Sequence, residues 1–283
     1  MTKANGTPLV VAFVADLMFT ARIQNVIRGL NYRVRWVGQA ADIEGEDLDI
    51  MVSPGEHLEG KTGRLFDLIT SWQPALLLFD LSNSAVPWQR WVPVLKSSAA
   101  TRRIPVLAFG PHTNVELMQE AKRGGADAVL ARSRFTADMP SLLQKYVRVP
   151  QYDAIYTACQ EPLAPLARSG IEKFNHGEYY ACHDDLEEAW RQDDSAARDL
   201  YRGILQIGIA YYQIQKGNYR GAVKMLLRVR QWLDPLHDTC RSVDVVQLRD
   251  DASAVHEALL SLGPDHIGDF DRNIFKPILF KDA

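Results

Sequence analysis

The sequence predicts an α/β domain with a doubly wound, parallel five-stranded sheet, followed by an all-α helical bundle. In the first half of the chain, short apolar runs alternate with helical patterns, and strands separated by helices form parallel sheets. In the second half the pattern is purely helical. A chain of 283 residues also has the length of about two domains, at roughly 100–200 residues each.

Five short runs in the first domain predict strands, and the first of them is continuously apolar, as expected of a strand buried on both faces. They cover residues 9–14, 34–37, 75–79, 105–109 and 128–131. Between the first two runs, Phe19, Ile23 and Ile27 recur at helical spacing. The last helix of this domain is expected at about 137–147. The alternation predicts a sheet with helices on both faces.

Residues 38–61 fit this alternation poorly, because they show little periodicity and contain four glycines and a proline. A connection of this length is uncommon inside a compact domain. We expect this segment to contain a short extra strand at 49–52 or to be a mobile loop.

The second domain follows a linker at 148–165 that contains Pro150, Pro162 and Pro165. Domain boundaries favour exposed, proline-rich segments, so the predicted domains are residues 1–149 and 150–283. Helices are expected at 163–174, 178–191, 195–215, 219–233 and 245–262.

Composition limits the possible partners and compartments. The net charge is −3, which gives no general attraction to nucleic acid or to an anionic membrane. The apolar run at 9–15 is too short to span a bilayer and lacks the flanks of a signal peptide. The three cysteines are far apart in the sequence, odd in number and without a CxxC pair, which favours a reducing compartment. We therefore expect a cytoplasmic protein without a membrane segment.

The order of elements, with Asp80 closing the third strand in PALLLFDL, resembles a response-regulator receiver domain over about residues 8–147. In that family, an acidic pair after the first strand and the aspartate after the third hold Mg²⁺, and that aspartate takes a phosphoryl group. A hydroxyl residue after the fourth strand and a lysine after the fifth complete the switch. The resemblance implies a receiver-like, flavodoxin-like fold.

The chain departs from this pattern at each of the other positions. Only Asp16 remains of the acidic pair, Gly110 replaces the hydroxyl residue, and Arg132 stands at the lysine position. Glycine cannot move a hydroxyl onto phosphoryl oxygens, and arginine replaces a point charge with a planar fork. Because ligands of such sheets bind at the carboxyl ends of strands, the degenerate receiver pocket should be lined by Asp16, Asp80, Gly110, His112 and Arg132. We expect a pseudo-receiver that does not switch on phosphorylation.

The second domain resembles the domain-of-unknown-function family 309 from about residue 170 to residue 262. The motifs that carry this resemblance are FNHGEYYACHDDLEEAW and RDLYRGILQIGIAYYQIQKGNYRGAVKMLL. The resemblance implies a helical bundle and brings no established activity.

Polar residues interrupt the apolar faces of this domain. Tyr179, His183 and Trp190 share one face of an expected helix, with Glu187 beside His183 at i+4. Buried polar groups need partners, so a polar stripe on the next helix should face them. We expect a buried Glu187–Arg202 pair. The predicted binding residues are Tyr179, His183, Glu187, Trp190, Arg198, Arg202, Gln206 and Gln213. This cluster is either a functional pocket or a structural network.

Three functions remain open from the sequence. The first is a non-enzymatic regulatory or scaffold protein that binds a protein partner, a second copy of itself or a small anionic ligand. The second is an enzyme that acts on a small anionic substrate in a cleft of His183, Glu187 and Arg202. The third, disfavoured, is nucleic-acid binding through a basic helix face of Arg220, Lys224 and Arg228. We expect no cofactor, and no metal because the second histidine of an HExxH motif is missing.

Overall fold

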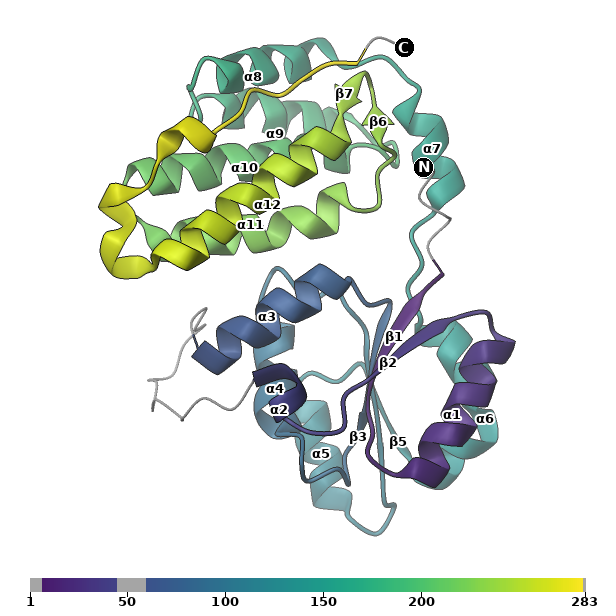
Figure 1. Ribbon diagram of the computed structural model, residues 1–283. Coiled ribbons are helices and arrows are strands. Elements are labelled where there is room, and N and C mark those ends of the chain that lie inside the picture. Colours follow the sequence, from purple (N-terminus) through teal and green to yellow (C-terminus); the bar gives the residue numbers. More distant parts are fainter. Residues whose placement is uncertain (1–6, 45–59, 282–283) are drawn as a thin grey trace. The chain divides into compact units, whose positions relative to one another are not determined.

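Five parallel strands form one sheet in the order β2-β1-β3-β4-β5 (Figure 1). The strands are β1 (Leu9–Phe13), β2 (Arg33–Trp36), β3 (Leu76–Asp80), β4 (Val106–Gly110) and β5 (Ala128–Ala131). This is the flavodoxin-like order of doubly wound sheets, whose switch point lies between β1 and β3. The predicted fold class of the first domain is therefore confirmed.

The computed structural model describes residues 7–44 and 60–281. Chain contacts divide it into two units, Met1–Val149 and Pro150–Ala283, which are described separately. The short strand considered at 49–52 lies outside the described residues.

Helices cover both faces of the sheet in the first unit. On one face lie α1 (Leu17–Gly29) and α6 (Arg132–Tyr146), and on the other α3 (Gly60–Trp72), α4 (Trp88–Ser97) and α5 (Val115–Arg123) (Figure 1). The short α2 (Ala41–Glu44) precedes α3. Phe109 of β4 stacks on Phe135 of α6 with ring centres 4.4 Å apart, and Phe13 stacks on Phe79 at 4.1 Å. The first pair holds α6 against the sheet, and the second packs the neighbouring strands β1 and β3 together.

Helix α4 was not predicted from the sequence. Its four buried residues, Trp88, Trp91, Val92 and Leu95, follow helical spacing, but Pro93 interrupts the run. Proline removes a backbone donor and weakens a helical pattern. Tertiary burial of the tryptophans nevertheless holds this segment as a helix.

Helices dominate the second unit. They are α7 (Tyr152–Cys159), α8 (Pro165–Asn175), α9 (Cys182–Gln192), α10 (Asp199–Gln215), α11 (Tyr219–Leu233) and α12 (Val245–Leu262). Helix α10 packs against α8, α9 and α11, and two of its glycines permit the close approach. A Cβ at Gly203 would overlap the side chain of Leu233, and one at Gly208 would lie 2.8 Å from Cys182 Sγ. The predicted helical bundle is confirmed, with α10 at its centre.

Two sequence predictions for this unit were wrong. The unit is not purely helical, because β6 (Thr239–Cys240) and β7 (Val243–Asp244) form an antiparallel hairpin that Phe280 joins through a bridge to Val243. In addition, the predicted linker at 148–165 contains the helix α7. Its eight residues bury only Ile155, Ala158 and Cys159, which is too short a pattern to recognise among prolines.

Cys159 and Cys240 form a disulfide that joins the end of α7 to β6, across 81 residues of sequence. Cys182 is a free thiol, buried in α9, and burial raises its pKa to about 12. The expectation of a reducing compartment therefore loses the support it took from the cysteine pattern. No helix in residues 7–44 and 60–281 is long and apolar enough to cross a bilayer.

Candidate functional site

The carboxyl edge of the sheet brings Asp16, Asp80 and Arg132 together. Asp80 is the last residue of β3, and its side chain is only 3% exposed. Arg132 Nη2 donates to Asp80 Oδ2 at 2.6 Å, and Arg132 Nη1 lies 3.6 Å from Asp16 Oδ2. The other oxygen of Asp80 accepts the backbone N–H of Ser82 at 2.9 Å. The guanidinium of Arg132 thus lies between the carboxylates of Asp16 and Asp80 at this edge.

Local structure determines where each of these side chains lies. Asp16 is the N-cap of α1 and accepts the N–H of Phe19 at 3.1 Å, as a capping carboxylate does. Arg132 begins α6 directly after β5, so parallel pairing brings it to the same edge of the sheet. Its guanidinium lies 5.1 Å from the ring centre of Phe19 and 5.7 Å from that of Phe109. Cation–π contacts of this kind add to the ion pair.

Gly110 occupies the predicted position at the end of β4. A Cβ at Gly110 would lie 3.2 Å from Leu81 Cβ and 3.3 Å from Leu117 Cδ2. Packing around this glycine therefore leaves little room for the side chain that a phosphoryl switch requires. His112 is exposed in the loop after β4.

The residues at this edge do not fit a bound magnesium ion. Mg²⁺ requires near-octahedral oxygen ligation at about 2.0–2.1 Å. Here Oδ2 of Asp80 is already bound by Arg132, so a metal ion at Asp80 would lie beside the positive charge of the guanidinium. Among the described residues, no group of three or more His, Cys, Asp or Glu side chains is arranged to hold a metal ion.

The cluster expected around His183 in the second unit does not form as predicted. Helix α9 begins at Cys182 rather than at residue 178, so Tyr179 lies in the preceding turn. His183 and Glu187 are each 35% exposed, and Glu187 Oε1 accepts from Arg191 Nη2 at 2.8 Å. The predicted buried Glu187–Arg202 pair was therefore wrong, because a nearby arginine on the same helix binds Glu187.

The other predicted residues of this unit separate into three places. Arg202 lies between two indoles, 4.8 Å from the Trp190 ring centre and 4.1 Å from that of Trp232. Gln213 accepts from Asn218 Nδ2 at 2.7 Å in the turn between α10 and α11. Tyr179 packs edge-on against Phe174, Tyr211 and Phe275, and burial raises its pKa. Arg202 of the predicted polar stripe thus contacts aromatic rings rather than the His183–Glu187 pair.

Arg241 is a buried, densely hydrogen-bonded charge of the second unit that sequence reasoning missed. Its side chain is 4% exposed, and its backbone N–H donates to Cys159 O at 2.7 Å. Its guanidinium donates to Asp193 Oδ2 (2.5 Å), Ser195 Oγ (2.9 Å), Glu161 Oε2 (3.1 Å), Ala158 O (3.4 Å) and the hydroxyl of Tyr201.

Arg241 and Ser242 form the tip of the β6–β7 hairpin, with φ values of 52° and 65°. Left-handed backbone costs roughly 1–2 kcal/mol for a side chain with a Cβ, so the contacts of Arg241 must outweigh that cost. Burial raises the pKa of Asp193, but hydrogen bonds from the Ser195 N–H and from Arg241 outweigh it and leave this pKa below its usual value. Arg241 therefore joins α7, the α9–α10 loop and the hairpin as a structural centre.

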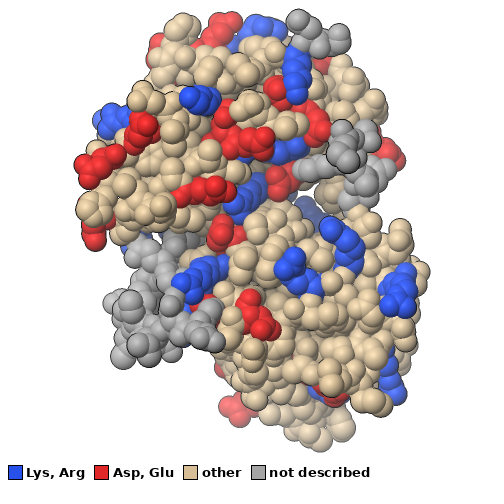
Figure 2. Space-filling model, viewed as in Figure 1, with Lys and Arg blue, Asp and Glu red and all other residues tan. Residues whose placement is uncertain are grey.

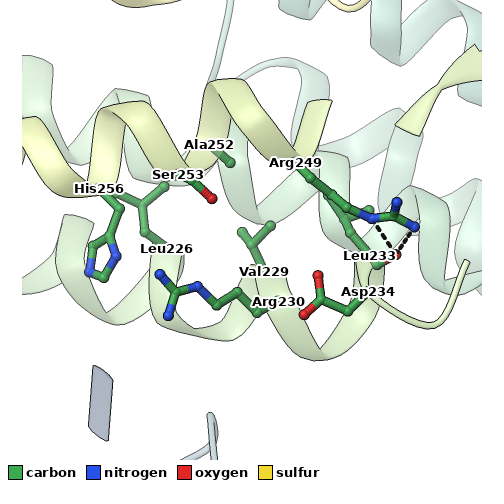
Figure 3. Close-up of a pocket in the computed structure, with 9 residues that line it drawn as sticks. All are labelled: Leu226, Val229, Arg230, Leu233, Asp234, Arg249, Ala252, Ser253 and His256. Carbon is green, nitrogen blue, oxygen red and sulfur yellow. Dashed lines mark hydrogen bonds between the residues drawn. The ribbon is translucent and has the colours of Figure 1, made fainter. Parts of the chain in front are cut away.

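A small pocket lies between α11 and α12 (Figure 3). Its volume of about 20 Å³ has room for one or two water molecules, far below the roughly 300 Å³ of a typical ligand site. Arg249 on its wall is already bound to the carbonyl oxygens of Leu233 and Leu236 and to Asp238. This pocket cannot enclose a metabolite-sized substrate.

Fold and site together define a receiver-like unit in which an arginine binds the aspartate at the end of β3, joined to a helical unit. Residues 167–225 match the family described as Domain of unknown function (DUF309). The chain is similar to the "Uncharacterized protein YpuF" of Bacillus subtilis (strain 168), with 29% identity over 90 residues. That region spans 31% of this chain and 41% of that protein, so less than half of the relative is represented.

Solved structures similar to the first half of the chain are receiver domains and response regulators. One is a response regulator from Hahella chejuensis (11% identity, TM-score 0.39), covering 50% of this chain and 97% of its own. Another is the receiver domain of the sensor histidine kinase PA1611 from Pseudomonas aeruginosa PAO1, with 13% identity and a TM-score of 0.38. This match covers 50% of the present chain and 98% of that structure. A third is the response regulator RPA3017 in red light signaling of R. palustris, with 17% identity and a TM-score of 0.37. This match covers 50% of the present chain and 95% of that structure.

Proposed function

We propose that this protein is a non-enzymatic regulatory or scaffold protein whose receiver-like unit works without phosphorylation. One observation carries the proposal: Arg132 binds Asp80 and approaches Asp16, where a receiver needs a metal ion and a free carboxylate. In this proposal the receiver-like unit presents a fixed surface for protein contact, and the helical unit binds the partner. The alternative enzyme has no support in geometry, because Glu187 pairs with Arg191 and its predicted cleft with Arg202 is not formed.

Charge distribution agrees with a protein partner more than with a polyanion. On the visible face, Lys, Arg, Asp and Glu side chains are interspersed over the helical unit, without a broad field of one sign (Figure 2). Residues 148–283 contain 16 Lys and Arg against 21 Asp and Glu. A net negative unit is unsuited to general nucleic-acid binding.

Treatment of the full-length protein with acetyl phosphate and Mg²⁺ tests the proposal. We expect no stoichiometric phosphoryl adduct by intact mass and no change in amide hydrogen exchange at β4 or at the start of α6. The Asp80→Asn variant is the control, because any adduct that it still forms comes from phosphorylation at other residues. A stoichiometric adduct that is absent from Asp80→Asn and alters exchange in these segments would show that the unit is a working receiver.

A further inference from the structure

Residues 275–281, which we call the strap, lie on the helical unit as an extended peptide lies in a binding groove. The chain after α12 returns along this unit and passes beside α8 and β7 (Figure 1). Asn175, the last residue of α8, binds the backbone of Ile278 twice. Its Oδ1 accepts the N–H at 2.7 Å, and its Nδ2 donates to the carbonyl oxygen at 3.1 Å. A side-chain amide that pairs with both groups of one residue fixes the backbone without reading the side chain.

The strap also adds to the edge of the β6–β7 hairpin. The N–H of Asp244 donates to Leu279 O at 2.9 Å, and the N–H of Lys281 donates to Ser242 O at 2.8 Å. In strand addition of this kind, main-chain hydrogen bonds give the affinity, and contacts of the side chains give the specificity. The side chains of the strap therefore indicate what the groove selects.

The dipeptide Phe–Lys occurs twice in the strap, and its phenylalanines are Phe275 and Phe280. Phe275 stacks on Tyr211 of α10 with ring centres 4.0 Å apart, and it meets Tyr179 edge-on at 5.7 Å. Phe280 has its ring centre 5.2 Å from the guanidinium carbon of Arg168 on α8. Both rings therefore contact side chains of the unit, so the groove favours an aromatic residue in its occupant.

The lysines that follow these phenylalanines act on two carboxylates at the start of α12. Lys281 Nζ pairs at 2.9 Å with Oδ1 of Asp244, the N-cap of this helix. Burial raises the pKa of Asp251, and the hydrogen bond from Gln247 and the charge of Lys276 offset only part of that rise. The carboxylates of the groove therefore favour a basic occupant over an acidic one.

Few apolar contacts hold the strap in place. Within residues 275–281, all of which the structure describes, only Ile278 is buried, while Leu279 and Phe280 are 48% and 41% exposed. Segments with few buried contacts open at a lower free energy than core helices. Pro277 fixes its own φ and disfavours helical backbone in the residue before it, so an opened strap stays extended. A segment with the same groups can therefore take its place.

We propose that the strap is an internal occupant of a peptide-binding groove, and that a partner protein displaces it with an extended segment in which an aromatic residue is directly followed by a basic one. Asn175 then binds the backbone of that segment, Tyr179 and Tyr211 contact its ring, and Asp244 or Asp251 pairs with its cation. This inference rests on the proposed function, because it names how the helical unit binds its partner.

Fluorescence anisotropy with the full-length protein tests this inference. The probe is a fluorescein-labelled peptide with the sequence of residues 270–281, FDRNIFKPILFK. The wild-type protein should bind the probe weakly, because its own strap competes. The variant Phe275→Ala should bind it at least about tenfold more tightly, because a larger fraction of the protein then has an open groove. Probes with Phe275→Ala or with Lys276→Glu/Lys281→Glu should lose most of this affinity.

Lys281→Gln opens the groove in a second way, at a side chain that is 46% exposed and lies outside the core. It removes the ion pair with Asp244, so the affinity for the probe should rise by at least about threefold. Adding Asn175→Ala should abolish this gain, because the backbone of the probe then loses its two hydrogen bonds. The control Arg272→Gln makes the same charge change at an exposed residue outside the strap, and should change affinity by less than about 1.5-fold.

Three results would overturn the inference: equal binding by the wild type and both opened variants, no binding by any of them, or undiminished binding of the probe without the Phe275 ring. A wild-type dimer in light scattering that Phe275→Ala dissociates would assign the groove to a second copy of the chain, and would overturn the partner assignment as well. None of these results bears on whether Asp80 accepts a phosphoryl group. Failure of this inference is therefore distinguishable from failure of the proposed function.

Discussion

Arg132 in the first unit and Arg241 in the second each pair with two acidic side chains, but the two arginines differ in burial and connectivity. Arg132 is 33% exposed and interacts with two carboxylates at the end of two strands. Arg241 is 4% exposed and binds three elements that are far apart in sequence. Arg132 therefore lies at the edge of the sheet where ligands of such folds bind. Arg241 instead connects loops that are too short to pack a hydrophobic core of their own.

This difference indicates how a buried charge relates to function. A guanidinium with access to solvent can exchange partners, because water stabilises the separated charges. A buried guanidinium with every donor occupied cannot, since breaking the pair leaves an uncompensated charge. We therefore expect the ion pairs of Arg132 to exchange partners more readily than those of Arg241, which forms a structural centre.

The largest expected effect comes from removing Arg241. Arg241→Met strands Asp193 and the hydroxyl of Tyr201, so the free energy of unfolding should fall by about 3–5 kcal/mol, as for other broken buried pairs. Urea unfolding of the full-length protein measures this loss. Because the pKa of Asp193 is lowered in the folded protein, its contribution is present at neutral pH and disappears as pH falls through that folded pKa. The penalty of the substitution should shrink in the same acidic range.

Ser242→Gly is the matched control for this prediction. Ser242 is exposed and has a φ of 65°, so glycine should leave stability unchanged or raise it slightly. If Arg241→Met costs no more than this control, the hydrogen bonds of Arg241 are not the centre that holds α7 and the hairpin.

A smaller effect is expected at Arg132. Arg132→Met leaves Asp80 with the N–H of Ser82 as its remaining hydrogen-bond donor, but water can reach the vacated position. We expect a loss of about 1–2 kcal/mol, between the values for surface pairs and for fully buried pairs. A double-mutant cycle with Asp80→Asn should show positive coupling, and Arg132→Lys should recover part of the loss. Additive single losses would mean that the two side chains do not stabilise each other.

Sequence reasoning succeeded for the first unit because parallel strands end at one edge of the sheet. Asp16, Asp80 and Arg132 could be placed at one edge of the sheet from the receiver resemblance together with the ends of the predicted strands, although their mutual pairing could not. It failed for Arg241, whose partners lie 40 to 83 residues away and mostly in loops that carry no periodicity. It also failed for Glu187, since periodicity placed this residue beside a buried face without revealing Arg191 as its partner.

The smallest expected effect is at Glu187. Glu187→Gln removes an exposed i,i+4 pair with Arg191 and a 3.8 Å approach to His183, so the free energy of unfolding should change by less than about 0.5 kcal/mol. Urea unfolding beside Arg191→Gln measures this change, and the two substitutions should cost similar small amounts, reduced further at high salt. A loss of several kcal/mol for Glu187→Gln alone would mean that Glu187 is buried with a different cation. The helical unit would then contain a second buried charge centre, and the contrast between an exposed Arg132 site and one structural arginine would no longer hold.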